Sequence, residues 1–71
     1  MSISLKIKAL LALTGKKQSD LMVALGMSSK QSLSNKFTNE RWSAEDLVTI
    51  AGECGCRVAF IFSDGQQITI E

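Results

Sequence analysis

The chain has 71 residues, 45% of them hydrophobic and 21% charged, and its formal net charge is +1. This length holds one hydrophobic core, so a single domain over residues 1–71 is expected, and the composition excludes a disordered chain. No segment reaches the roughly 20 consecutive apolar residues of a membrane-spanning helix, and no signal peptide is evident. We therefore expect a cytoplasmic protein without a membrane partner.

Charge is distributed unevenly along the sequence. Residues 1–42 contain seven Lys or Arg against two acidic residues, a net charge of +5. Residues 43–71 contain one Arg against five acidic residues, a net charge of −4. A basic half of this kind is typical of a surface that meets nucleic acid. The alternative is a solvated surface on which basic residues cluster by chance.

The first predicted helix covers Ile3 to Thr14 and is rich in helix-forming residues. Its apolar positions recur at helical spacing: Ile7, Leu10 and Leu11, extended by Leu5 and Leu13. We therefore expect this helix to be largely buried. Gly15 is placed to end it in the left-handed conformation.

A second helix is predicted from about Gln18 to Leu25. Its buried face is set by residues at i, i+3 and i+4: Leu21, Ala24 and Leu25. Gly26 ends it and keeps the following turn short. Lys17 stands where an N-cap is expected, although its ammonium group cannot accept the amide hydrogen bonds of the helix. A positive charge beside a helix N-terminus suits a bound anion.

A third helix is predicted over Lys30 to Phe37, with Ser28 or Ser29 as its cap. Leu33 and Phe37 repeat at i, i+4 and face inward. The outward positions carry polar or basic side chains: Lys30, Gln31, Ser34 and Asn35. Glutamine and asparagine pair with adenine edges, and lysine reaches guanine acceptors or phosphates. An ordinary solvated helix presents the same face, and both interpretations stay open on these residues alone.

A loop over residues 38–42 follows, with Asn39 as its left-handed residue and Trp42 as a core plug rather than a platform for a base. Ser43 and Asp46 predict the N-terminal capping box of a fourth helix. Its apolar stripe is Leu47, Ile50, Ala51 and Cys54. Its acidic residues direct this helix away from DNA.

The hydrophobic period changes to two after residue 55. One face is expected to carry Cys56, Val58, Phe60 and Phe62, and the other Arg57, Ala59 and Ile61. Asp64-Gly65 predicts a two-residue hairpin turn before a second strand over residues 67–70. Because an isolated hairpin is marginal in water, we expect the first face to cover the helical core. Ala59 and Ile61 are then expected to lie in a homodimer interface.

Residues suited to catalysis are sparse. The chain has no histidine and no tyrosine, and its carboxylates are scattered, so an enzyme is not expected. Cys54 and Cys56 are too close in sequence for an unstrained disulfide and are expected to be reduced. We expect no metal or other cofactor, and no small-molecule substrate site is evident.

The spacing of glycines, leucines and polar residues resembles the helix-turn-helix domain of the phage repressor and Cro superfamily. The resemblance covers about residues 5–55 and is carried by Gly15, Gln18, Leu21, Leu25-Gly26, Ser28, Ser32-Leu33-Ser34, Asn39, Leu47 and Ile50-Ala51. It implies a mainly α (α+β) fold. Four helices would form a lambda-repressor-like helix-turn-helix core over about residues 3–55, with a C-terminal β-hairpin over about residues 56–70.

The resemblance also implies a function. In that family the third helix reads bases in the major groove, which assigns base contacts to Lys30, Gln31, Ser34 and Asn35. The glutamine that opens the second helix binds a phosphate, and the loop after the third helix contributes further backbone contacts. The expected backbone contacts are Lys16, Lys17, Gln18, Lys36 and Arg41. The predicted protein is a homodimeric, sequence-specific transcriptional regulator of phage or mobile-element type that binds double-stranded DNA.

Two alternatives use the C-terminal hairpin instead. In one, the chain is a protein-interaction module whose helices are only a scaffold. In the other, it is an antitoxin-like protein that binds DNA but chiefly neutralises a partner protein.

Overall fold

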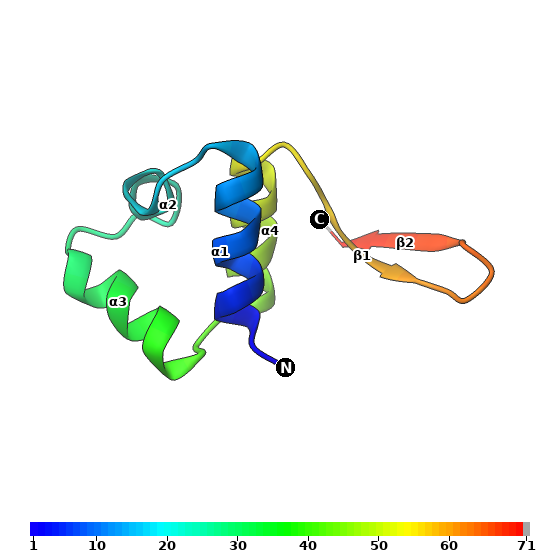
Figure 1. The fold of residues 1–71 in the computed structure, drawn as a ribbon, viewed down its shortest axis with the longest axis horizontal. Coiled ribbons are helices and arrows are strands. Elements are labelled where there is room, and N and C mark those ends of the chain that lie inside the picture. Colours follow the sequence, from blue (N-terminus) through cyan, green and yellow to red (C-terminus); the bar gives the residue numbers. More distant parts are fainter. Residues whose placement is uncertain (71) are drawn as a thin grey trace.

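The computed structural model describes residues 1–70, which form four helices and one antiparallel hairpin (Figure 1). The helices are α1 (Ile3–Thr14), α2 (Gln18–Ala24), α3 (Lys30–Asn39) and α4 (Ala44–Glu53). The strands are β1 (Val58–Ile61) and β2 (Gln67–Ile70). The predicted mainly α architecture and the order of its elements are therefore confirmed.

Local side-chain caps explain where the helices begin. Ser2, Ser29 and Ser43 cap α1, α3 and α4, and each hydroxyl accepts the amide three residues further on at 3.0–3.1 Å. The start of α2 has no such hydroxyl. There the Asp20 carboxylate accepts the amide N–H of Lys17 at 2.8 Å, so the acid of the first turn supplies the capping bond.

The end of α3 differs from the prediction. The helix runs past Phe37 and includes Asn39, and Glu40 is the left-handed residue, with a φ of 55°. The prediction for Asn39 is therefore wrong. A left-handed conformation is uncommon for a residue with a side chain and costs on the order of 1 kcal/mol or more.

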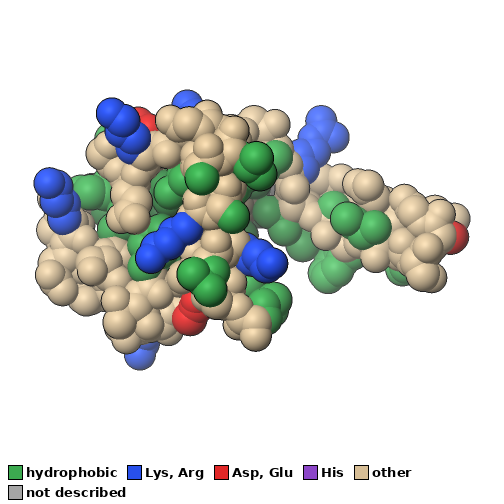
Figure 2. Space-filling model, in the orientation of Figure 1, with side chains coloured by type: hydrophobic (Ala, Val, Ile, Leu, Met, Phe, Trp, Pro, Cys, Tyr) green, Lys and Arg blue, Asp and Glu red, His purple; other side chains and the backbone are tan. Residues whose placement is uncertain are grey.

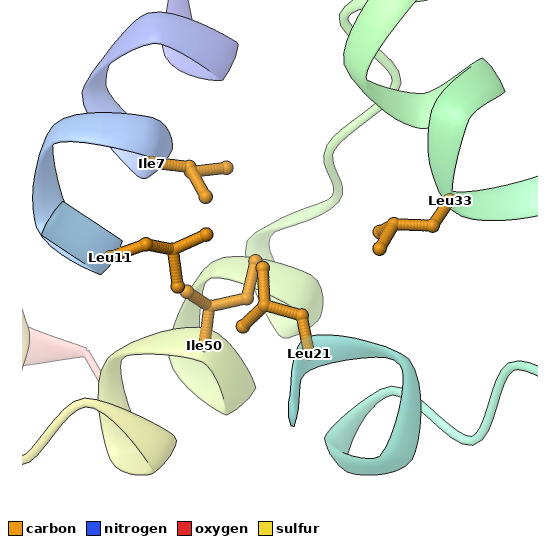
Figure 3. Packing of buried hydrophobic residues seen from close by; sticks show 5 residues of the cluster. All are labelled: Ile7, Leu11, Leu21, Leu33 and Ile50. Carbon is orange, nitrogen blue, oxygen red and sulfur yellow. The ribbon is translucent and has the colours of Figure 1, made fainter. Parts of the chain in front are cut away.

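The hydrophobic core lies where all four helices meet. Five side chains from the four helices, two of them on α1, point toward one another: Ile7, Leu11, Leu21, Leu33 and Ile50 (Figure 3). Leu21 is the most completely enclosed, at 0% exposed, and a fully buried side chain of this kind contributes about 1.5–3 kcal/mol. Trp42 is half-buried against this core, as predicted, and meets Phe37 edge to face with ring centroids 4.9 Å apart.

The buried stripe of α1 is narrower than predicted. Leu5 and Leu13 are exposed, at 65% and 86%, because the other helices contact only one side of α1. The buried residues of that side are Ser4, Ile7 and Leu11. The prediction that the two outer leucines extend the core is wrong, and a polar serine occupies part of the stripe instead.

The hairpin projects away from the helices (Figure 1). The molecule measures 41 × 22 × 20 Å, and its radius of gyration of 12.6 Å exceeds the roughly 11 Å of a compact chain of this length. The strand pairs are Val58–Ile70, Ala59–Thr69, Phe60–Ile68 and Ile61–Gln67. Gly55, left-handed at a φ of 74°, turns the chain out of α4, and β1 begins three residues later.

The hairpin turn is longer than predicted. Gly65 N–H donates to the Phe62 carbonyl at 2.9 Å, and Phe62 N–H donates to the Gln66 carbonyl at 2.8 Å. The loop therefore contains residues 63–65, with Gly65 in the left-handed conformation at a φ of 92°. This is the three-residue hairpin type and not the two-residue type.

The prediction that the Phe60 face covers the helical core is wrong. Phe60 and Phe62 are 62% and 50% exposed, and Ile68, which pairs with Phe60, is 56% exposed. Cys56 is also exposed. Only the base of the sheet, at Val58, Ala59 and Ile70, is half-buried, because β1 reaches α4 only there. The hairpin thus carries an apolar face that the helices leave open.

Candidate nucleic-acid interface

The solvent face of α3 brings together the four residues predicted to read bases. Lys30, Gln31, Ser34 and Asn35 are all exposed, and their spacing places them on one side of the helix. Leu33 lies on the other side and anchors α3 in the core. The whole helix contains no Asp or Glu, so its exposed face is free of acidic groups.

Two of these side chains are hydrogen-bonded to each other. Gln31 Nε2 donates to Asn35 Oδ1 at 3.0 Å, across one turn of α3. The bond leaves the Gln31 carbonyl oxygen as an acceptor and the Asn35 amide nitrogen as a donor. The pair therefore presents one acceptor and one donor in fixed proximity.

A hollow of 400 Å³ lies between the starts of α2 and α3. Its lining residues are Gln18, Ser19, Met22, Lys30, Leu33 and Ser34. Gln18, a predicted backbone contact, thus borders the same hollow as Lys30 and Ser34, which are predicted base contacts. The amide, hydroxyl and ammonium groups at this site can bind an anionic oxygen together.

The predicted backbone cations divide into two groups. Lys17 and Arg41 are exposed. Lys16 is paired with Glu53, with 3.3 Å between Nζ and Oε2. Sequence reasoning missed this pair because its two members lie far apart along the chain.

Lys36 is held more firmly. Its Nζ lies 2.7 Å from Asp46 Oδ2, donates to the Arg41 carbonyl at 3.2 Å, and sits 5.8 Å from the centre of the Trp42 ring. Burial raises the pKa of Asp46, but the hydrogen bonds from Lys36 and Ser43 outweigh it and hold the pKa below its usual value. The Asp46 carboxylate therefore stays charged and keeps the Lys36 ammonium group in this ion pair.

Charged side chains are spread over the helical part of the molecule. In the view of Figure 2, lysine and arginine dominate the charged surface of this part, and an acidic side chain marks the tip of the hairpin. Two acids of α4, Asp46 and Glu53, bond with lysines of the basic half. The sequence-level split of charge is thus partly cancelled by contacts within the fold.

Three further features concern metal ligands, thiols and membrane spans in the described part of the chain. Within residues 1–70, no three His, Cys, Asp or Glu side chains are grouped to hold a metal ion. Cys54 is half-buried and Cys56 exposed, and both are free thiols. Over the same residues, no helix has the length and apolar character needed to cross a membrane.

Comparisons with family models, with curated proteins and with solved structures find no match to this chain. Its function is therefore inferred from its own residues.

Proposed function

We propose that the protein is a sequence-specific DNA-binding transcriptional regulator of phage or mobile-element type. In this proposal α2 and α3 form a helix-turn-helix like that of the phage repressor and Cro superfamily, with α3 in the major groove. The observation that carries the proposal is the exposed face of α3, which combines two amides, a serine and a lysine without an acidic residue. The major groove admits an α-helix, and these are the side chains that bind base edges.

Gln31 and Asn35 supply the base preference. Adenine presents a donor at N6 and an acceptor at N7 in the major groove. The acceptor of Gln31 and the donor of Asn35 match these two groups while the bond between the side chains is kept. The proposed operator therefore contains an A·T pair opposite this turn of α3.

Phosphate contacts supply most of the affinity. Lys17, Gln18 and Arg41 are exposed and take these contacts. Lys16 and Lys36 contribute less net attraction, since Glu53 and Asp46 already neutralise them.

A homodimer is part of the proposal. The hairpin exposes Ile61 on one face and Phe60, Phe62 and Ile68 on the other. A two-stranded sheet needs such surfaces to be covered for stability. We place the dimer interface on the hairpin, at Ala59 and Ile61 as well as at Phe60, Phe62 and Ile68. A symmetric dimer would read two half-sites about 34 Å apart.

The same exposed hairpin favours a second candidate function. A different protein chain can cover Phe60, Phe62 and Ile68, as in a protein-interaction module or an antitoxin-like protein. A measured self-association through the hairpin would argue against this candidate, and a monomer in solution would argue for it.

The proposal is tested by the salt dependence of binding to duplex DNA. Phosphate contacts release counterions, so the association constant should fall steeply between low and moderate salt. Fluorescence anisotropy with a duplex selected from a random-sequence pool measures this slope. A flat response, or no selection of any sequence, would contradict DNA binding.

A further inference from the structure

The end of α3 is joined to the start of α1 through the side chain of Glu40. Its carboxylate accepts the amide N–H of Ser4 at 3.0 Å and the hydroxyl of Ser2 at 2.7 Å. The first amides of a helix have no partner within the helix, and the positive end of its dipole favours an anion. Glu40, the left-handed residue that ends α3, therefore caps α1 from a different element.

Ser4 continues the connection into the core. It is 6% exposed, and its hydroxyl donates to the Phe37 carbonyl at 2.7 Å while accepting from Trp42 Nε1 at 3.0 Å. The Phe37 carbonyl belongs to the last turn of α3, where carbonyls lack helical partners. One buried serine thus bonds with α3 and with the segment that follows it, and its own polar groups are satisfied.

Two further features indicate that this contact is held under constraint. The hydrogen bond from Ser2, followed by that from the Ser4 amide, lowers the pKa of Glu40 and keeps its carboxylate charged. Glu40 also has a positive φ, which a residue with a side chain keeps only where the surroundings enforce it. The hydrogen bonds of the Glu40 carboxylate with Ser2 and Ser4 hold the residue in this conformation.

We infer that Ser2, Ser4, Glu40 and Trp42 form a clasp that sets the orientation of α3 on the helical body, with Glu40 as a positioning residue for base reading. Leu33 anchors the middle of α3, and rotation about this anchor moves Asn35 and Gln31 relative to the DNA. The clasp opposes that rotation at the C-terminal end. Its effect on base reading rests on the proposed function, whereas its effect on helix orientation does not.

The test compares the wild-type chain with Glu40→Gly, Glu40→Gln and the control Glu45→Gln. Glycine adopts the left-handed conformation without strain and removes the carboxylate. Glu45 is an exposed carboxyl of the first turn of α4, so Glu45→Gln makes the same change of charge as Glu40→Gln outside the clasp. Residual dipolar couplings of the α1 and α3 amides report the relative orientation of the two helices.

Binding is measured on two probes: a duplex selected by the wild-type protein and a random-sequence duplex pool. We expect Glu40→Gly to change the α1–α3 couplings and to lower the affinity ratio of the two probes about tenfold, the effect of losing one good base contact. Affinity for the random pool should stay the same or rise, because a negative charge is lost. Glu45→Gln should leave both the couplings and the ratio unchanged.

Unchanged couplings in a folded Glu40→Gly chain would overturn the inference, and so would changed couplings with an unchanged affinity ratio. If Glu40→Gly does not fold, the same two readouts on Glu40→Gln decide, with the same signs. If the wild-type chain binds neither probe, the proposed function fails. The dipolar couplings then still show whether the clasp orients α3.

Discussion

The helical body and the C-terminal hairpin bury apolar surface to very different extents. In the body, four helices enclose Leu21 completely and close their first turns with Ser2, Ser29, Ser43 and Asp20. In the hairpin, two short strands leave Phe60, Phe62 and Ile68 in solvent. The body has a core shared by all four helices, whereas a two-stranded hairpin needs a further surface for stability. The body therefore governs monomer stability, and we expect the hairpin to govern assembly.

The largest expected effect separates the two regions by stability. Leu21→Ala should lower the free energy of unfolding by about 2–5 kcal/mol, because it leaves a cavity among all four helices. Thermal denaturation followed by far-ultraviolet circular dichroism measures it. Phe60→Ala at low protein concentration is the control in the hairpin and should change monomer stability much less. Equal losses for the two variants would abolish the distinction between the regions.

The next effect concerns assembly through the hairpin. Phe60 is exposed in the single chain. Phe60→Lys should raise the dimer dissociation constant about thirtyfold, since an aromatic residue that becomes buried in an interface contributes about 2 kcal/mol of binding free energy. Sedimentation equilibrium measures this constant. Ile61→Lys places the same charge on the opposite face of β1, so the larger of the two effects identifies the face that contributes more to the interface. If neither substitution changes the mass, the hairpin is not the dimer interface.

A smaller effect concerns base reading within the body. Gln31→Ala should reduce discrimination at one base position by about tenfold, because one bidentate partner is lost. Lys17→Ala should instead weaken binding to all sequences alike and reduce the salt slope. Binding to a panel of single-base operator variants separates the two outcomes. If both variants lose the same affinity for every operator variant, α3 does not read the bases.

The smallest expected effect is a pH dependence of the stability of the helical body. The pKa of Asp46 in the folded state lies below its usual value of 3.8. The charged carboxylate therefore stabilises the folded state fully above pH 3.8, and this stabilisation is lost as the pH falls through the folded-state pKa. Unfolding in urea below about pH 4 should therefore show declining stability. Asp46→Asn should reduce this decline by about 1 kcal/mol or less. The hairpin variant Phe60→Ala should follow the wild-type pH profile, and a profile unaffected by Asp46→Asn would contradict the assignment.

Much of the fold was predictable because its signals are local. Ser43 and Asp46 lie three residues apart and form the expected capping box, and Gly15 ends α1 in the expected left-handed conformation. Leu33 was placed in the core by its spacing from Phe37. Each of these features depends on residues within one turn of helix, where spacing alone determines which groups meet.

The errors occur where the outcome depends on packing between elements. Asn39 has the better intrinsic propensity for a left-handed residue, but Glu40 takes that place because its carboxylate bonds with the start of α1. Leu5 and Leu13 fit an apolar stripe, yet no other helix covers their side of α1. Neither result can be read from periodicity, because both depend on which surface another element reaches.

The candidate site divides in the same way. The exposed face of α3, with Lys30, Gln31, Ser34 and Asn35, follows from helical spacing and was predictable. The engagement of Lys36 by Asp46 and the clasp around Glu40 were not, because their members come from different helices. The sequence predicts a phosphate contact for Lys36 and no role for Glu40.

By itself, the sequence determined four helices, the serine cap of α4, the central core residues and a polar face on α3. These depend on near-neighbour spacing and on the burial of apolar side chains. Tertiary structure alone decided that the Phe60 face of the hairpin stays open, that two lysines are neutralised by α4, and that Glu40 joins α3 to α1. Such contacts depend on how whole helices and strands are placed relative to one another, and the spacing of residues within one element does not determine that placement.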